Sequence, residues 1–309
     1  MIQESNQNKE NPAPHTWESH HPKRISFILP TKNRGAILER TLAQLRTVIT
    51  ARDELIIIDG GSKDSTCEVV ERNRDLVNIF VSEPDQPGEA NNKGIILSRG
   101  KFVFFLNDDD IVHPSELEKA IHVLDEHPDI DVLYCGGTVY FHSQPKKASF
   151  IYVPQGIQYG KEVEDVFRYG ACSAATVIRR HVFPITGMFD PMHPWVCDSE
   201  FIMRCIKEKM KVRFCRINLF EHRVTDISAS HTKKTEVYRD KIALARKYCG
   251  KIFFILYLLK KAPWSRRLKI SGIASALLDL HERVGQNGMR GFFMPRRSFS
   301  PPVWDGGFS

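Results

Sequence analysis

Short apolar runs alternate with helical patterns over the first half of the chain. Four runs of β-branched and aromatic residues occur, at Ile25–Leu29, Leu55–Ile58, Ile79–Val81 and Phe102–Leu106. Continuous runs of this kind are typical of parallel strands that are buried on both faces. Residues 36–49 and 115–127 instead place their apolar positions at helical spacing. This order predicts an α/β fold with an open, mostly parallel central sheet flanked by helices.

The pattern is less regular from about residue 130 to 230. Three more strands are expected, at Val132–Cys135, Thr138–Phe141 and Thr176–Ile178, the first two on either side of Gly136-Gly137. Asp198–Lys209 is expected to be a helix that buries Phe201, Ile202, Cys205 and Ile206. No long-period repeat occurs, which argues against solenoids and propellers.

Each of the four early runs ends in polar or turn-forming residues. These endings are Pro30-Thr31, Asp59-Gly60-Gly61-Ser62, Glu83-Pro84-Asp85 and Asn107–Asp110. In open α/β sheets, ligands bind beyond the carboxyl ends of the strands. We therefore expect these four segments to meet at one edge of the sheet and to form the functional site there.

The acidic segment predicts a metal site. Three adjacent carboxylates, those of Asp108, Asp109 and Asp110, follow Asn107 at the end of a very apolar run. They repel one another unless a cation or solvent screens them, and carboxylates suit Mg²⁺ or Mn²⁺, which also bind substrate phosphates. The alternative is a solvated turn, because Asn and Asp are common in turns.

Other candidates come from loops and helix ends. The glycines after Asp59 permit a tight turn and leave that carboxylate at the strand end as a hydrogen-bond acceptor, although a plain strand-to-helix turn would look the same. Asp198 and Glu200 cannot share a helical face, so at most one of them faces the site. Lys93 could meet a phosphate, and His222 a phosphate or a metal, but a solvated lysine and a packed histidine are the commoner cases.

Charge and composition distinguish the C-terminal segment. The net charge is +7, and residues 241–309 hold 13 Lys or Arg against 3 Asp or Glu. Their longest apolar run, Ile252–Leu259, is far shorter than the about twenty residues that span a bilayer. We expect residues 233–309 to form a basic, largely helical extension. It either contacts an anionic membrane surface peripherally or caps the α/β domain with a solvated basic face.

The remaining composition predicts a cytoplasmic location, with an optional peripheral contact on the inner membrane face. The seven cysteines are scattered and form no C-x-x-C pair, which argues against a disulfide framework or a zinc ribbon. Residues 1–23 are polar without an apolar stretch, so we expect a disordered tail rather than a signal peptide. No nucleic-acid-binding motif accompanies the basic segment.

Taken in order, five motifs over roughly residues 24–230 resemble family 2 glycosyltransferases. They are Arg24–Arg34, Ile57–Thr66, Ser82–Asp85, Asn91–Ile95 and Gly100–Asp110. The resemblance implies the GT-A fold, in which residues 24–112 bind the nucleotide-sugar and residues 113–232 bind the acceptor. It also implies transfer of a sugar from a nucleotide-diphosphate donor, by default a UDP-sugar, to a hydroxyl of a glycan or lipid-linked acceptor with inversion.

Residue roles carry over by position. The resemblance implies that the donor is bound by Pro30, Thr31, Asn33, Asp59, Gly61, Asp85, Lys93 and Asp108. It implies that Mn²⁺ or Mg²⁺ is bound by Asn107, Asp109 and Asp110, with Asp109 as the main ligand. Asp198 matches the general base that deprotonates the acceptor hydroxyl. The chain departs from the family pattern at Lys32, Asn91, Asn107 and Cys197, where an aromatic residue, Arg, Asp and Glu are usual.

Two other classes stay open on the sequence alone. A nucleotidyltransferase would share the metal and the sheet edge, but it more often has a Gly-rich basic loop after the first strand, where this chain has Pro30–Gly35. A non-catalytic nucleotide-sugar-binding protein would keep the donor residues and need no base. A dehydrogenase is disfavoured because no G-x-G-x-x-G follows the first strand.

Overall fold

The described residues of the computed structural model are 23–85, 88–141, 148–151, 162–169, 171–224 and 233–261. In chain order they form β1 (Lys23–Thr31), α1 (Gly35–Leu45), β2 (Glu54–Asp59), α2 (Thr66–Arg72), β3 (Ile79–Ser82), α3 (Glu89–Leu97), β4 (Gly100–Phe105), β5 (Ile111–Val112), α4 (Pro114–Glu126), β6 (Val132–Phe141), β7 (Ala148–Ile151), α5 (Glu162–Tyr169), a 3₁₀ turn η2 (Ser173–Ala175), β8 (Thr176–Arg179), α6 (Val182–Thr186), α7 (Cys197–Lys207), β9 (Val212–Val224), α9 (Lys234–Tyr248) and α10 (Lys251–Lys261). The strands join one nine-stranded sheet in the order β3-β2-β1-β4-β8-β6-β9-β5, with β7 on β6.

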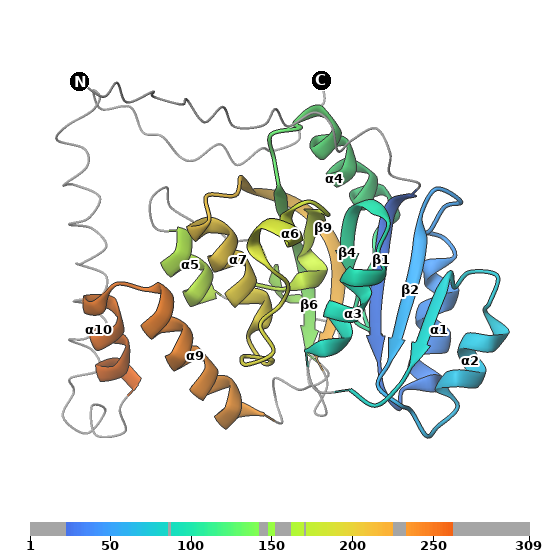
Figure 1. Ribbon diagram of the computed structural model, residues 1–309, viewed down its shortest axis with the longest axis horizontal. Helices are drawn as coiled ribbons and strands as arrows, with labels where there is room; N and C mark the ends of the chain where they lie inside the picture. The colour runs from blue at the N-terminus through green and yellow to red at the C-terminus, as the bar shows by residue number, and fades with distance from the viewer. Residues whose placement is uncertain are drawn as a thin grey trace, which may run out of the picture.

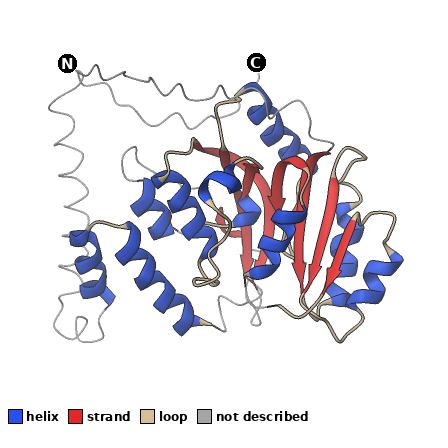
Figure 2. Cartoon of the chain, in the orientation of Figure 1, coloured by secondary structure: helices blue, strands red, loops and turns tan. Residues whose placement is uncertain are grey.

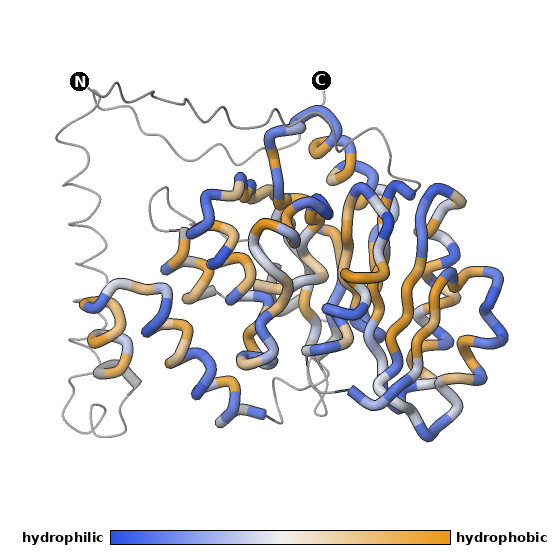
Figure 3. Tube along the Cα trace, viewed as in Figure 1, coloured by the Kyte–Doolittle hydropathy of each residue, from blue (hydrophilic) through white to orange (hydrophobic). Residues whose placement is uncertain are grey.

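The first half of the sheet is parallel, as the apolar runs predict. β1 pairs with β2 and β4, and β2 pairs with β3, all in parallel. Within this register Thr31 lies opposite Asp59, so the ends of β1 and β2 are level. These strands are apolar along most of their length in Figure 3, and β2 is buried throughout. The carboxyl ends therefore form the shared edge that the sequence predicts.

The second half adds antiparallel pairings. β8 runs antiparallel to β4 and to β6, and β5 antiparallel to β9, whereas β6 and β9 are parallel. The expectation of two strands around Gly136-Gly137 was wrong, because β6 runs continuously through both glycines. The register with β9 shifts there instead, and a Cβ on Gly137 would lie 2.1 Å from the Phe220 ring. Gly137 thus admits a neighbouring aromatic ring, and neither glycine ends the strand.

Helices cover both faces of the sheet, as Figure 2 shows. One core lies between the sheet and α1, α2 and α4, and includes Phe27, Leu42 and Leu124. The other lies under α3, α5, α7 and α9, and includes Val103 and Phe201. Figure 1 shows the sheet between α1 and α2 on the right and α5, α7, α9 and α10 on the left. The expected α/β arrangement, a central sheet flanked by helices, is confirmed.

The C-terminal segment is described up to residue 261 and is helical there. α9 and α10 pack on the second core through Leu244, Tyr248 and Phe253. Among the described residues, no helix is both long and apolar enough to cross a bilayer. The expected N-terminal tail, but for Lys23 at the start of β1, and the extension from residue 262 onward lie outside the described residues. The proposed domain boundaries stay predictions.

Candidate functional site

Asp59 ends β2 and is completely buried. Its Oδ2 accepts hydrogen bonds from the backbone N–H of Ser62 at 3.0 Å and from the hydroxyl of Ser82 at 2.6 Å, and its Oδ1 accepts one from the hydroxyl of Ser62. The turn Asp59–Ser62 closes on itself because Gly61 adopts φ +76° beside Pro84. A side chain at Gly61 would be strained in that conformation. Asp59 is therefore held rigidly at the edge of the sheet.

Asn33 joins the loops that follow β1 and β2. It adopts φ +54°, a left-handed conformation that Asn tolerates better than most residues. Its backbone N–H donates to Ser62 Oγ at 2.7 Å, and its side-chain oxygen accepts from the N–H of Lys63 at 2.8 Å. Pro30 and Thr31 precede it at the end of β1, where Thr31 pairs with Asp59. Three residues predicted to bind the sugar donor therefore lie beside Asp59 at this edge of the sheet.

The loop after β3 brings Asp85 to the same edge. A Cβ on Gly60 would lie 2.7 Å from Asp85 Oδ1, which shows how closely the two loops approach. Asp85 Oδ2 is buried and has no hydrogen-bond partner among the residues that the structure describes. Burial raises the pKa of Asp85 above its ordinary value, although Lys93 and Lys32 oppose the shift. Such an orphaned acceptor is a candidate for binding a donor group of a ligand.

Lys93 lies on α3 near this loop but is already paired. Its Nζ lies 2.9 Å from Glu83 Oε1, and this contact, the strongest of several, raises the pKa of Lys93. It would contact a phosphate only by leaving or sharing Glu83. The structure places Lys93 beside the predicted donor surface without showing that role.

Asp108 is buried, and of the three consecutive acids only Asp110 is more enclosed. Its Oδ2 accepts from the Thr31 hydroxyl at 2.9 Å, and its Oδ1 lies 2.9 Å from Arg34 Nε. Its backbone carbonyl accepts from the Thr41 hydroxyl at 2.6 Å. Burial raises the pKa of Asp108 to about 6, against the charge of Arg34. Asp108 therefore anchors the acidic loop to β1 and α1.

Arg34 is a site residue that the sequence did not single out. Its Nη2 also pairs with Asp109 Oδ2 at 2.7 Å, so one guanidinium neutralises two neighbouring carboxylates. The sequence contains one hint of this role, which is the position of Arg34 directly before α1. A basic residue at a helix N-terminus is not stabilised by the helix dipole, so another contact has to explain it. The contact with the acids is the reason for its position.

His222 completes a group of metal-ligating side chains. His222 Nδ1 lies 2.7 Å from Asp110 Oδ1, and one ligand atom each from Asp109, Asp110 and His222 lie within 4.8 Å of one another. β5 begins directly after Asp110 and pairs antiparallel with β9 at Glu221, which brings His222 opposite Asp110. No local spacing relates residues so far apart, so the sequence could only name His222 as a weak candidate.

Asp110 and His222 shift each other's pKa. Burial raises the pKa of Asp110, while His222 opposes that shift. Burial alone would lower the pKa of His222, but Asp110 holds it above the ordinary value. Asn107, predicted as a ligand, donates from Nδ2 to Asp110 Oδ2 at 2.7 Å and so orients that carboxylate. Two carboxylates and an imidazole whose ligand atoms lie within 4.8 Å of one another are a donor set that suits Mn²⁺ or Mg²⁺.

Asp198 lies in the first turn of α7 and belongs to the same region. Its Oδ2 accepts from the backbone N–H of Ser173 at 2.9 Å. Burial raises the pKa of Asp198, and the charge of Asp110 adds to that rise, so the two carboxylates act on each other. Glu200 is fully buried elsewhere in the fold, as expected for residues two apart on a helix. The arrangement can thus hold a cation and offer a nearby base.

Comparison of the sequence with protein families gives one match. Residues 26–183 match the model of "Glycosyl transferase family 2". An uncharacterised glycosyltransferase of Rickettsia typhi is 25% identical over 214 residues, which are 67% of this chain and 66% of that protein. The poly(ribitol-phosphate) β-N-acetylglucosaminyltransferase TarP of Staphylococcus aureus is 37% identical over 103 residues, 31% of each chain. The chain thus spans just under two thirds of the first relative and about a third of the second.

Solved structures share the fold at low identity. The mannosyltransferase PcManGT of Pyrobaculum calidifontis, in complex with GDP-Man and Mn²⁺, superposes with a TM-score of 0.60 at 16% identity, covering 93% of this chain and 84% of that one. S. aureus TarS 1–349 in complex with UDP-GlcNAc gives a TM-score of 0.57 at 18% identity, covering 77% and 72%. At these identities the likeness establishes the fold alone.

Proposed function

Because this chain belongs to glycosyl transferase family 2, we propose that it transfers a sugar from a nucleotide-diphosphate-sugar to a hydroxyl group with inversion. The observation that supports this most directly is the group Asp109, Asp110 and His222, with Asp198 close enough that the charge of Asp110 raises its pKa. A nucleotide-binding protein without catalysis would need Asp109, Asp110 and His222 to hold a cation, but it would not need Asp198 as a general base.

The donor would lie across the loops that follow β1, β2 and β3. The unpartnered oxygen of Asp85 would accept a hydrogen bond from the nucleobase or ribose, with Pro30, Thr31, Asn33 and Gly61 lining the pocket. Asp59, which is buried and accepts from Ser62 and Ser82, would accept one only by giving up part of that network. We propose a UDP-sugar as the donor. Among structural relatives, the name of one includes UDP-GlcNAc and that of another GDP-Man, so the base has to be identified by experiment.

The residues divide the chemistry between leaving group and nucleophile. A divalent cation bound by Asp109, Asp110 and His222 would stabilise the negative charge that develops on the departing nucleoside diphosphate. Asp198 accepts the proton of the acceptor hydroxyl while the oxygen of that hydroxyl bonds to the anomeric carbon. The bond from that carbon to the diphosphate breaks on the opposite side, which inverts the configuration. No covalent sugar–enzyme intermediate is required.

Calorimetric titration of UDP-, GDP- and dTDP-sugars, each with and without Mn²⁺, tests the donor and the cation together. We expect one nucleotide to bind, with an affinity that Mn²⁺ increases. Asp109→Asn should abolish the Mn²⁺ effect, whereas Asp129→Asn, at an exposed position on the surface, should not. If Mn²⁺ does not change the nucleotide affinity of the unaltered protein, the proposed cation site is wrong. If no nucleotide-sugar binds at all, the proposed function is wrong.

We further propose a glycan or lipid-linked acceptor and peripheral contact with the inner face of a membrane. Ile252 and Ile255 of α10 are 58% and 55% exposed, and exposed Lys251 precedes them. Exposed apolar side chains beside basic ones suit an anionic lipid surface. The protein should float with anionic liposomes, and Ile252→Asp combined with Ile255→Asp should reduce its recovery there. If the variant and the unaltered protein are recovered equally in the lipid-free fraction of the gradient, the membrane contact is rejected.

A further inference from the structure

Glu200 is a buried acid of α7 that the proposed reaction does not use. Its side chain is fully buried, two residues after Asp198. Burial alone would raise its pKa, but hydrogen bonds from Arg204 and Tyr248 hold the pKa of Glu200 below its ordinary value, so the group is charged. A buried charge is costly unless partners surround it. Its partners show what the charge organises.

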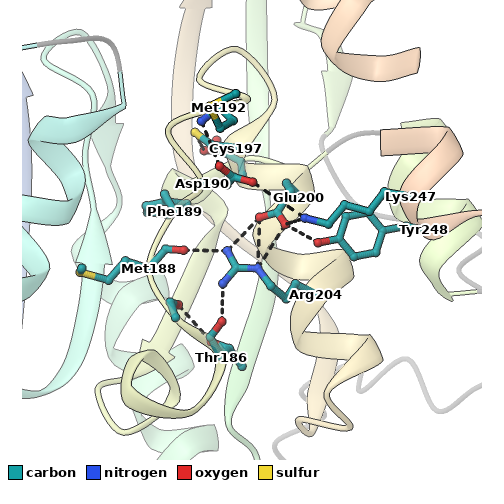
Figure 4. Close-up of polar contacts among 12 residues, drawn as sticks. Thr186, Met188, Phe189, Asp190, Met192, Cys197, Glu200, Arg204, Lys247 and Tyr248 are labelled. Carbon is teal, nitrogen blue, oxygen red and sulfur yellow. Dashed lines mark hydrogen bonds and ion pairs between the residues drawn. The ribbon is translucent and has the colours of Figure 1, made fainter. Parts of the chain in front are cut away.

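Arg204 connects Glu200 to the chain segment before α7. Its Nη2 lies 2.8 Å from Glu200 Oε2, one turn away on the same helix. The same guanidinium donates from Nη2 to the carbonyl of Met188 at 2.6 Å and from Nη1 to the carbonyl of Thr186 (Figure 4). The planar fork of an arginine can bind a carboxylate and two carbonyls at once, which a lysine cannot. Arg204 therefore fixes the start of loop 187–196 against α7.

α9 closes the arrangement from the other side. The Tyr248 hydroxyl donates to Glu200 Oε1, and Lys247 Nζ lies 3.3 Å from the same oxygen. Lys247 also lies 3.8 Å from Asp190 Oδ2, within the loop, as Figure 4 shows. α9 lies beyond the residues that match the family model. The extension thus contacts both the helix of the proposed base and the loop that leads into it.

Further contacts hold the middle of the loop. The Asn92 side chain donates to the carbonyl of Phe189 at 2.8 Å and accepts from its N–H at 2.9 Å. Asn92 belongs to α3, the helix that carries Lys93 on the donor side. On the α9 side, His193 Nδ1 lies 3.7 Å from Asp240 Oδ1. Loop 187–196 is therefore fixed between a donor-side helix and the C-terminal extension, while Met192 within it is 77% exposed.

We propose that Glu200, Arg204 and Tyr248 form a clasp that positions Asp198 and loop 187–196, the segment that leads into the helix of the proposed base. The inference rests on the proposed function for its chemistry. Glu200 and Arg204 are positioning residues, since they act through the start of α7 and through the loop backbone. The clasp makes the acceptor half of the reaction depend on α9, while the donor loops on β1 to β3 are held by their own contacts.

Arg204→Lys tests the clasp most sharply, because it keeps the charge and loses the fork. Lys207→Arg, at an exposed position on the same helix, is the matched control. Tyr248→Phe removes a single donor and serves if Arg204→Lys does not fold. Hydrogen exchange of residues 186–196 and calorimetric binding of nucleotide with Mn²⁺ are measured for each. The turnover number and the KM for the donor are measured by nucleoside diphosphate release.

We expect Arg204→Lys, and more weakly Tyr248→Phe, to accelerate exchange at Thr186 and in loop 187–196, and to leave nucleotide affinity and donor KM unchanged. Turnover should fall by on the order of tenfold to a hundredfold, as expected when a reacting group is displaced slightly. Unchanged exchange in the loop, or a parallel loss of nucleotide affinity, would overturn the clasp. Hydrogen exchange requires no substrate, so failure of the clasp is distinguishable from failure of the proposed function, which would appear as no nucleotide binding to the unaltered protein.

Discussion

Replacing Asp198 with Asn exchanges one carboxylate oxygen for an amide nitrogen, so it tests the catalytic role of Asp198 with little effect on folding. The Ser173 N–H donates to Asp198 Oδ2 at 2.9 Å, and the side-chain oxygen of Asn can accept the same hydrogen bond. The amide cannot accept a proton at any relevant pH. Loss of a general base typically costs about 10²- to 10⁴-fold in rate. At about 1.36 kcal/mol for each factor of ten, this is roughly 3–5 kcal/mol of transition-state stabilisation.

Whereas Asp198→Asn should lower turnover, it should leave the stability of the protein unchanged or increase it. Burial raises the pKa of Asp198, so the folded state favours the protonated carboxyl. The stability that this group contributes is present below its unfolded pKa of about 3.9 and is lost as pH rises through the folded value. At neutral pH the buried carboxylate is therefore unfavourable. Asp198→Asn should unfold at the same temperature or higher, while it loses turnover.

The assay combines three measurements on one preparation. Nucleoside diphosphate release gives turnover, calorimetry with Mn²⁺ gives donor affinity, and thermal unfolding at several pH values gives stability. Turnover of the unaltered protein should fall in acid with a midpoint above that of an ordinary Asp. Asp129→Asn is the control and should change none of the three. Retained turnover in Asp198→Asn, or a loss of donor affinity equal to the loss of turnover, would refute the assignment of the base.

Three further outcomes are expected. His222→Gln should weaken Mn²⁺ binding by at least about tenfold in a paramagnetic resonance titration, and an unchanged affinity would remove His222 from the cation site. Gly94→Ala should cost about 1–3 kcal/mol in urea unfolding, because its Cβ would lie 2.3 Å from Ile28 Cγ2 and α3 would have to move from β1; an unchanged midpoint would contradict that packing. Burial alone would raise the pKa of Asp53, but hydrogen bonds led by Arg24 hold it below its ordinary value. Its stabilisation is therefore present above the unfolded pKa and lost as pH falls through the folded one. Asp53→Asn should be less stable than the unaltered protein at neutral pH, and the difference should shrink in acid.

The local pattern of the chain already determines the first half of the fold and the place of the site. The apolar runs predict β1, β2, β3 and β4, and parallel strands present their carboxyl ends at one edge. That rule alone brings Asp59 and the acidic loop together. It works because strand period and strand ends are encoded by neighbouring residues.

The contacts within the site were decided by tertiary structure. His222 reaches Asp110 because β5 pairs antiparallel with β9 in one register, and a shift by one residue would turn the imidazole to the other face of the sheet. Arg34 pairs with the acids, and Asn107 turns its amide onto Asp110. Register and side-chain pairing depend on elements that are distant in the chain, so local spacing carries no signal for them. The sequence by itself determined which strand ends form the site, whereas the antiparallel half of the sheet decided which side chains face one another there.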